Sequence, residues 1–400
     1  MTSSLWLRVF LPFAAGYYLS YLLRTVNAVI APELTRELAL TAADLGLLTS
    51  AYLLTFAAFQ IPLGLLLDRY GPRKVEAGLL LLAAAGTLLF ALGRTPFELT
   101  LARGLIGLGV SACLMAAFKG FAQNFPAERQ ASLTGAIMAS GGLGAITASL
   151  PLEFALPLLG WRGVFQGLTF LLVAVAVLIF FSVPQREAGV SRDSLGAQLK
   201  DVAGILASRI FWRYAPPVAL ITGGFLAVQG LWAVPWLMHV EGLSRHQAAE
   251  VLFSLNLAML LAHLGIAFFA TRLAKAGLRP AVLLVAGFAL ALISQAAILF
   301  GAQPAVALWF AYGTGISGGS LAYALLSGQF APSLSGRVTT ALNLLLFVGA
   351  FGLQWGLGVL IDGLILSGFA AATAYRATFA ALLILQVAAY TWFLLGGRRR

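Results

Sequence analysis

The chain has 400 residues, of which 60% are hydrophobic and only 10% are charged, and its mean hydropathy is +0.94. A water-soluble domain of this size could not carry so much apolar surface without aggregating, so these values predict an integral membrane protein. The formal charge of +11 does not indicate nucleic-acid binding, because the basic residues stand singly between apolar runs.

Apolar runs long enough to cross a membrane recur along the whole chain. A transmembrane helix needs about 20 such residues, and cutting the sequence at charged or Gly/Pro-containing breaks yields twelve candidates. Their approximate limits are 8–31, 45–67, 75–92, 97–121, 132–154, 163–183, 214–239, 249–270, 280–300, 305–329, 338–361 and 376–395. The sequence therefore predicts an all-α membrane protein with twelve transmembrane helices.

One polar stretch, residues 184–212, divides these spans six and six. We predict an N-terminal six-helix half at 1–183, a cytosolic linker at 184–212 and a C-terminal six-helix half at 213–400.

The two halves are also weakly similar in sequence. Residues 64–73 and 270–279 both end in Gly-x-Arg, and residues 160–165 (GWRGVF) align with 374–379 (AYRATF), which share an arginine and a phenylalanine. These matches indicate a duplicated unit and hence pseudo-symmetric halves.

The basic residues predict the orientation. If the N-terminus is cytosolic, most of the 25 Lys and Arg fall in cytosolic segments, as membrane insertion favours. The residues on the opposite face would be Arg36, Arg94, Arg162, Arg245 and Arg376. We therefore expect a multi-pass protein of a bacterial inner (plasma) membrane, with both termini in the cytosol.

The first span carries the main candidate for substrate binding. Tyr17, Tyr21 and Arg24 recur at i, i+4 and i+7, so one helix face presents two phenols and a guanidinium. Arginine keeps its charge inside a membrane, so we predict that Arg24 binds an anionic substrate, with Asn27 further along the helix. The alternatives for Arg24 are an ion pair between helices or extension to the membrane surface.

The segment 64–74 places charged residues between two apolar runs and predicts a tight connection. Gly71 and Pro72 would turn the chain, and Gly64 would let a neighbouring backbone approach closely. Asp68 needs a partner at the membrane boundary, which would be the positive end of a packed helix or a nearby arginine.

The spacing G-x-x-x-D-R-x-G-x-R in this segment resembles the loop between helices 2 and 3 of the major facilitator superfamily of transporters. The resemblance implies that the loop latches the two halves on the cytosolic side and that spans 1, 4, 7 and 10 line the substrate cavity. It also implies that Asp68 holds the start of span 11 near Gly336 and Arg337, and that Arg73 reaches Glu128. The predicted gating residues are Gly64, Asp68, Arg69, Gly71, Arg73 and Glu128.

The run from Tyr18 to Pro32 is similar to helix 1 of the organic-anion and organic-phosphate antiporters in this superfamily, mainly at Tyr21 and Arg24. Those antiporters use a second arginine in helix 7, whereas residues 227–230 contain none. We therefore expect a singly charged organic anion rather than a phosphorylated substrate.

In the fourth span, Arg103 precedes glycines at helical spacing, which is similar to a superfamily motif linked to proton coupling. The glycines permit close helix packing, and Arg103 would pair with an acid on a neighbouring helix. No acid lies at the predicted middle of the membrane, so Glu33, Glu153, Asp362 or a histidine would carry a coupled proton. Lys119 would extend to the cytosolic surface.

The second half supplies aromatic and amide candidates for the substrate site. They are Gln229, Trp232 and Trp236 on span 7 and Trp309 and Tyr312 on span 10. Trp232 and Trp236 are one turn apart, which is typical both of a stacking wall and of an interfacial aromatic belt.

Met259 and His263 on span 8 could instead bind Cu(I), because thioether and imidazole ligands suit this ion. The chain has only five methionines and one cysteine, Cys113, so we expect no resident metal or cofactor. Paired acids or an activated nucleophile are not apparent, which argues against an enzyme.

Together these observations predict a secondary transporter that moves a small organic anion with a proton, as a symporter working by alternating access. The alternatives are a Cu(I) importer using Met259 and His263, or an exporter of small metabolites or drugs. We expect the substrate, the proton and the lipid bilayer to be its partners, without nucleic acid and without a second protein subunit.

Overall fold

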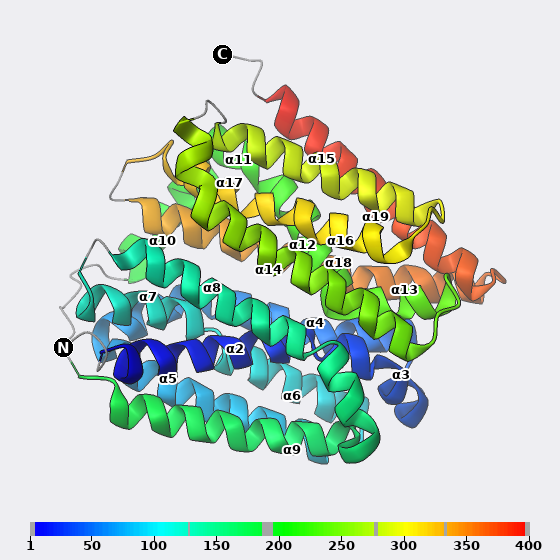
Figure 1. Ribbon diagram of the computed structural model, residues 1–400, viewed down its shortest axis with the longest axis horizontal. Helices are drawn as coiled ribbons and strands as arrows, with labels where there is room; N and C mark the ends of the chain where they lie inside the picture. Colours follow the sequence, from blue (N-terminus) through cyan, green and yellow to red (C-terminus); the bar gives the residue numbers. More distant parts are fainter. Residues whose placement is uncertain (1–4, 127–128, 186–194, 276–278, 332–333, 397–400) are drawn as a thin grey trace. The chain divides into compact units, whose positions relative to one another are not determined.

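The computed structural model describes residues 5–126, 129–185, 195–275, 279–331 and 334–396 (Figure 1). Every regular element in these ranges is helical. The chain forms two compact units. The first unit consists of Met1–Ala39 and Ala51–Arg192, and the second consists of Leu40–Ser50 and Asp193–Arg400.

The helices of the first unit follow the first six predicted spans. They are η1 (Trp6–Phe10), α2 (Leu11–Thr25), α3 (Asn27–Leu38), the end of α4 (Ala42–Ala58), α5 (Gln60–Leu92), α6 (Pro96–Gly109), α7 (Cys113–Asn124), α8 (Gln130–Thr147) and α9 (Leu150–Ser182). Within this unit α2 packs against α8 and α9, and α5 packs against α6 and α9 (Figure 1).

The helices of the second unit follow the remaining spans. They are α10 (Leu195–Leu206), α11 (Arg209–Pro217), η3 (Val218–Thr222), α12 (Gly223–Ala227), η4 (Val228–Trp232), α13 (Ala233–His239), α14 (Arg245–Lys275), α15 (Pro280–Leu299), α16 (Ala305–Ile316), η5 (Ser317–Ser320), α17 (Leu321–Ser327), α18 (Ser335–Leu366) and α19 (Ala371–Leu395). Within this unit α14 and α15 pack against α16, and α12 packs against α18.

Eight helical stretches in the described residues are long and apolar enough to cross a membrane, judged by length and composition. Pro62–Leu92, Leu150–Ser182 and Ser335–Leu366 are among them. Large apolar side chains project from these helices, and Phe170 and Phe181 of α9 are each 76% exposed. Surfaces of this kind are stable in lipid rather than in water, which agrees with the prediction of a membrane protein.

Two of the long helices bend at a glycine that lies in a predicted connection. The backbone of α5 has φ 78° at Gly71, and that of α9 has φ 63° at Gly160. Glycine tolerates this left-handed region because it has no Cβ. Pro72 then begins the second part of α5, a position where its missing N–H is not needed. Gly71 and Pro72 therefore turn the chain as the sequence predicts.

Glycines on α6 and α16 bring helices together in the same way in both units. A Cβ at Gly107 would lie 2.2 Å from the carbonyl oxygen of Tyr52, and a Cβ at Gly313 would lie 2.4 Å from that of Leu255. These distances are too short for any larger residue, so backbone contact defines both crossings. The equal geometry supports the predicted pseudo-symmetry of the halves.

The matching segments 160–165 and 374–379 also place their arginines alike. Arg162 donates from Nη2 to the carbonyl of Gly93 at 2.9 Å, just after α5 ends. Arg376 donates from Nη1 to the carbonyl of Leu299 at 3.1 Å, where α15 ends. In each unit an arginine therefore satisfies a carbonyl at the end of a helix, where cations are favoured.

Glu37, near the end of α3, contacts Trp161 and Arg162 in the same part of the first unit. Its carboxylate accepts a hydrogen bond from Trp161 Nε1 at 2.7 Å and forms an ion pair with Arg162. Partial burial acts to raise the pKa of Glu37, but the hydrogen bonds from Trp161 and Arg162 outweigh it and hold that pKa below its ordinary value.

The beginning of α4 belongs to the second unit, an exchange that the predicted domains do not contain. Asp362 of α18 accepts hydrogen bonds from the backbone N–H of Ala42 at 3.0 Å and of Ala43 at 2.7 Å. The first N–H groups of a helix have no partner within it, and a carboxylate there also interacts favourably with the helix dipole. Gly358 completes the contact, because a Cβ there would lie 2.3 Å from the carbonyl of Ala42.

Candidate functional site: buried arginines in the first unit

Arg24 lies in α2 and is buried, with 8% of its surface exposed. Its guanidinium carbon lies 4.5 Å from the ring centroid of Tyr21, 5.2 Å from that of Phe56 and 5.9 Å from that of Tyr52. Aromatic faces carry negative partial charge and attract cations, so rings from α2 and α4 hold the guanidinium inside the unit. The alternative that Arg24 extends to the membrane surface is therefore wrong.

Tyr52 brings a second arginine to the same place. Arg103 of α6 is fully buried, lies 5.0 Å from the Tyr52 ring centroid and donates from Nη1 to the carbonyl of Leu23 at 2.7 Å. The hydroxyl of Tyr52 donates to the carbonyl of Ser20 at 3.1 Å, which fixes the ring against α2. Two buried guanidinium groups thus share one aromatic ring.

The surroundings of Arg103 differ from the prediction. Within the described residues Nη1 bonds a carbonyl rather than an acid on a neighbouring helix, and Nε has no hydrogen-bond partner. A carbonyl dipole offsets only part of a full positive charge, so this part of the unit favours a negative ligand. Sequence analysis missed Tyr52, whose only signal is its i, i+4 spacing to Phe56.

Of the other predicted residues of the first span, Tyr17 and Tyr21 lie on α2 with Arg24, and Asn27 begins α3. The rings of Tyr17 and Tyr21 pack edge to face at 5.3 Å, and the Tyr17 hydroxyl points to Sδ of Met138 at 3.9 Å. Gly141 of α8 leaves room for them, because a Cβ there would lie 2.6 Å from the ring of Tyr17. Asn27 is fully buried at the start of α3.

In the second unit, the candidate substrate-binding residues carry neutral polar groups instead of charges. Gln229 is fully buried and donates from Nε2 to Asn256 Oδ1 at 2.7 Å and to Met259 Sδ at 3.6 Å. His263 lies one turn further along α14, with Nδ1 2.8 Å from the carbonyl of Met259. Hydrogen bonds therefore engage the sulfur of Met259 and one ring nitrogen of His263, which weakens the case for Cu(I) ligation.

The predicted aromatic residues of the second unit are all buried. Trp232 donates from Nε1 to the carbonyl of Gln354 at 2.9 Å, and Trp236 donates to Glu241 Oε1 at 3.1 Å. Both indoles are fully buried, so an interfacial belt in contact with lipid headgroups does not describe them.

Trp309 and Tyr312 pack edge to face on α16, with ring centroids 6.2 Å apart. The alignment of Gly107 with Gly313 places Trp309 at the position that Arg103 has in the first unit. Its buried Nε1 has no hydrogen-bond partner among the described residues, so it is a free donor there.

The predicted gating segment contains an ion pair that the sequence did not indicate. Asp68 Oδ1 lies 2.5 Å from Lys119 Nζ, which also donates to the carbonyl of Leu67 at 2.9 Å. Lys119 is thus the partner of Asp68, and the expectations of an arginine partner and of a surface-directed lysine are wrong within the first unit. The predicted contact of Asp68 with Gly336 and Arg337 would join the two units and stays a prediction.

The remaining predicted gating residues differ in their contacts and exposure. Arg73 donates from Nη1 to the carbonyl of Val183 at 3.3 Å, while Arg69 is exposed and lies over the ring of Tyr70 at 5.3 Å. Glu128, the predicted partner of Arg73, and residue 277 of the second half lie outside the described residues. No atom of the first unit's described residues lies within 4 Å of a Cβ built at Gly64, so the close backbone expected there is absent.

We expect Asp68→Asn and Lys119→Met each to slow turnover about 5-fold without changing the KM for substrate. The side chains are 24% and 37% exposed for Lys119 and Asp68, so water screens the pair and it contributes no more than about 1 kcal/mol. The double variant should turn over no more slowly than either single variant, because both act on one interaction. Initial uptake rates in proteoliposomes measure this, and additive losses or an altered KM would contradict it.

The acids predicted to carry a proton have different surroundings. Glu33 is half-buried in the middle of α3, Glu153 is half-buried in the first turn of α9, and Asp362 accepts hydrogen bonds from the start of α4. Sequence analysis did not consider Glu76, the second residue of a predicted span beside Lys74. In the structure Glu76 is fully buried.

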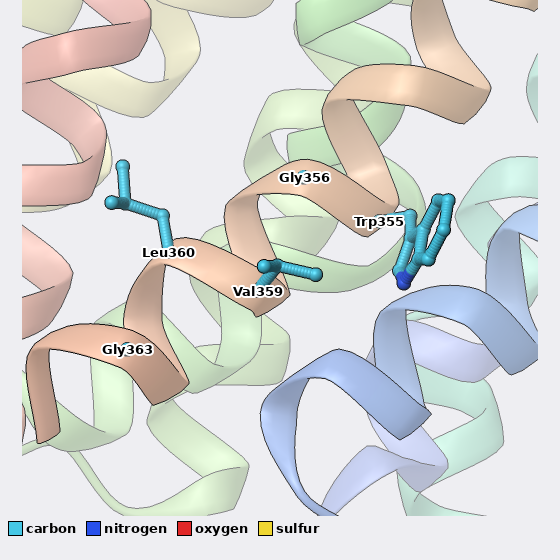
Figure 2. A pocket seen from close by; sticks show the side chains of 5 residues that line it. All are labelled: Trp355, Gly356, Val359, Leu360 and Gly363. Carbon is cyan, nitrogen blue, oxygen red and sulfur yellow. The ribbon is translucent and has the colours of Figure 1, made fainter. Parts of the chain in front are cut away.

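An apolar hollow of about 460 Å³ lies on α18. Figure 2 shows Trp355, Val359 and Leu360 projecting from the helix around Gly356 and Gly363. The lining contains no charged group that could bind an anion, and its large side chains are 40–49% exposed, as on a surface that faces lipid. The charged residues of the first unit therefore remain the candidates for binding an anion.

The fold, with its long apolar helices and exposed apolar side chains, defines a multi-pass membrane protein. The structure matches a bacterial homologue of the human lysosomal transporter Spinster with a TM-score of 0.75 and 18% identity, covering 98% of this chain and 96% of that one. It matches the POT family transporter PepTSo with a TM-score of 0.78 and 11% identity, covering 99% of both chains. Residues 13–353 match the Major Facilitator Superfamily, and the chain belongs to this family. The predicted fold class is thereby confirmed, and so is the prediction that the protein is a secondary transporter and not an enzyme.

Curated relatives match only part of the chain. A probable sulfoacetate transporter of Cupriavidus necator is 31% identical over 37% of this chain and 35% of its own length. The hexuronate transporter of Escherichia coli is 27% identical over 50% of each chain. A probable nitrate/nitrite antiporter of Thermus thermophilus is 25% identical over 55% of this chain and 51% of its own length. The matched stretches span about half of the relatives' length or less.

Proposed function

We propose that this transporter takes up a small organic anion together with a proton, by alternating access, in a bacterial inner membrane. The observation that carries the proposal is the pair of buried guanidinium groups, Arg24 and Arg103, on the ring of Tyr52. Burying positive charge in a membrane protein is costly, and an anion that enters the site offsets that cost.

The relatives support the same substrate class. The names of these three transporters refer to sulfoacetate, hexuronate and nitrate or nitrite, all of which are anions. Within the second unit, Gln229, Trp232, Trp236, Trp309 and Tyr312 offer neutral donors and aromatic rings, which are groups that suit the uncharged part of an organic substrate. Tyr17, Tyr21 and Asn27 would complete the site beside Arg24, and the segment around Asp68 would gate it.

Transport by the purified protein in liposomes tests this proposal. We expect an inward proton gradient to drive saturable accumulation of D-galacturonate or sulfoacetate, while D-galactose, which lacks the carboxylate, is not accumulated. A protonophore should abolish accumulation but not equilibration. Accumulation of D-galactose, or flux that never exceeds equilibrium, would contradict proton-coupled anion uptake.

A further inference from the structure

Glu76 is a buried carboxyl group that the substrate site does not use. It lies in α5, four residues after Pro72, and none of its surface is exposed. Neither Oε1 nor Oε2 has a hydrogen-bond partner among the described residues. A group in this position needs an explanation, because buried polar atoms are normally satisfied.

Three neighbouring helices enclose Glu76. On α2, a Cβ at Gly16 would lie 2.4 Å from Oε1, so the carboxyl group rests against the backbone of that helix. On α7, the thiol of Cys113 interacts with it, and on α9 the apolar Ile179 faces the same glycine. Cys113 is therefore the titratable group that faces Glu76 from another helix, and a thiol is only a weak donor.

The basic residues on the same helix are engaged elsewhere. Arg73 donates to the carbonyl of Val183 and lies 4.8 Å from the ring centroid of Phe180, and Lys74 is exposed. Among the described residues, a carboxylate enclosed in this way has no cation and only the weakly donating Cys113 thiol to offset its loss of hydration. The neutral, protonated carboxyl group is the form that this enclosure stabilises.

Packing does not require an acid at this position. Gly109 of α6 contacts α5 at Ala83, and Gly315 of α16 contacts α15 at Ala291 with the same backbone atoms. Glu76 stands two turns before the first alanine, and Leu284 stands two turns before the second. Leu284 is also fully buried, so the second unit fills the equivalent place with an apolar side chain.

We propose that Glu76 is the proton-binding site through which this transporter couples anion uptake to the proton gradient, an inference that rests on the proposed function. A hydronium ion from one side of the membrane would give its proton to a carboxylate oxygen, forming an O–H bond and leaving water. Rearrangement of α2, α5 and α7 would then expose the carboxyl group to the other side, where the proton returns to water.

Cys113 connects this group with the anion site. Its thiol interacts electrostatically with both Glu76 and Arg24, so the acid and the guanidinium lie on the same small part of the unit. Protonation of Glu76 removes a negative charge from this part of the unit, which makes the same region more favourable for a substrate anion. Binding of proton and anion would therefore favour each other, as symport requires.

Transport of D-galacturonate, sulfoacetate and D-galactose in proteoliposomes tests the coupling with Glu76→Gln and Glu76→Leu, the second of which copies Leu284. A pH difference of one unit should drive about 10-fold accumulation of the singly charged D-galacturonate by the native protein if one proton moves with each anion. Both variants should lose this accumulation and retain pH-independent counterflow. Glu250→Gln removes an exposed carboxylate and should behave as the native protein. Accumulation by either Glu76 variant at the native level would overturn the proposal.

A second measurement does not depend on any substrate. At neutral pH the native protein should show the infrared C=O stretch of a protonated carboxyl group, which Glu76→Gln should lose and Glu250→Gln should keep. Absence of this band from the native protein overturns the assignment of Glu76 even if transport is found. If the band is present but the native protein moves no anion, the proposed function fails while the proton site stands.

Discussion

Arg24→Gln is expected to raise the KM for the transported anion about 100-fold, because the variant loses a charge-assisted interaction worth roughly 3 kcal/mol. The amide keeps two donors but carries no charge, and the rings of Tyr21 and Phe56 that surround the guanidinium would enclose a neutral group. The KM of Arg24→Lys should lie between those of the native protein and Arg24→Gln, since lysine keeps the positive charge but lacks the planar pair of donors. Uptake of labelled D-galacturonate and sulfoacetate over a range of concentrations measures the effect.

Arg36→Gln provides the matched control, because Arg36 is exposed in the neighbouring α3 and its loss should leave the KM unchanged. The amount of monodisperse protein after detergent extraction shows whether each variant folds. An unchanged KM in well-folded Arg24→Gln would remove Arg24 from the substrate site, whereas the assignment of the family would stand.

Gly107→Ala should destabilise the protein by about 3 kcal/mol and abolish uptake. The new Cβ would lie 2.2 Å from the carbonyl oxygen and 2.7 Å from the Cα of Tyr52, and backbone atoms cannot move aside as a flexible side chain can. Displacing Tyr52 would also disturb the ring that Arg24 and Arg103 share. Thermal unfolding of the detergent-purified protein, followed with uptake, measures both consequences.

Two further variants show whether the effect of Gly107→Ala comes from the steric conflict or from the loss of a glycine as such. Gly78→Ala lies in a helix where no atom is within 4 Å of the new Cβ, so it should be neutral or slightly stabilising. Gly313→Ala makes the corresponding contact of 2.4 Å with Leu255 in the second unit and should be as damaging to stability as Gly107→Ala. Equal melting temperatures for Gly107→Ala and Gly78→Ala would show that α4 and α6 can separate without penalty.

Hydrophobicity and residue spacing are sufficient to predict the class of protein, because the length of an apolar run and the position of charges are properties of the sequence itself. The runs around 75–92 and 163–183 correspond to helices, and the glycines that bend α5 and α9 fall in the predicted connections. The motif from Gly64 to Arg73 indicates the family by the spacing of its residues alone. Periodicity also places Tyr21 and Arg24 on one face, and their contact in the structure follows from it.

Partners from distant segments depend on the packing of helices. Lys119 meets Asp68, Tyr52 joins Arg24 to Arg103, and residues 40–50 pack with the second unit because Asp362 binds the start of α4. A sequence shows that a charge lies within a membrane segment but not which helix faces it. Glu76 shows this most clearly, because the sequence places it only at the edge of a predicted span, two residues after Lys74, and the approach of Gly16 and Cys113 encloses it. The sequence alone determined the membrane class and the family, whereas the tertiary structure decided which charges are buried and with which neighbours, since burial depends on contacts between helices far apart in the chain.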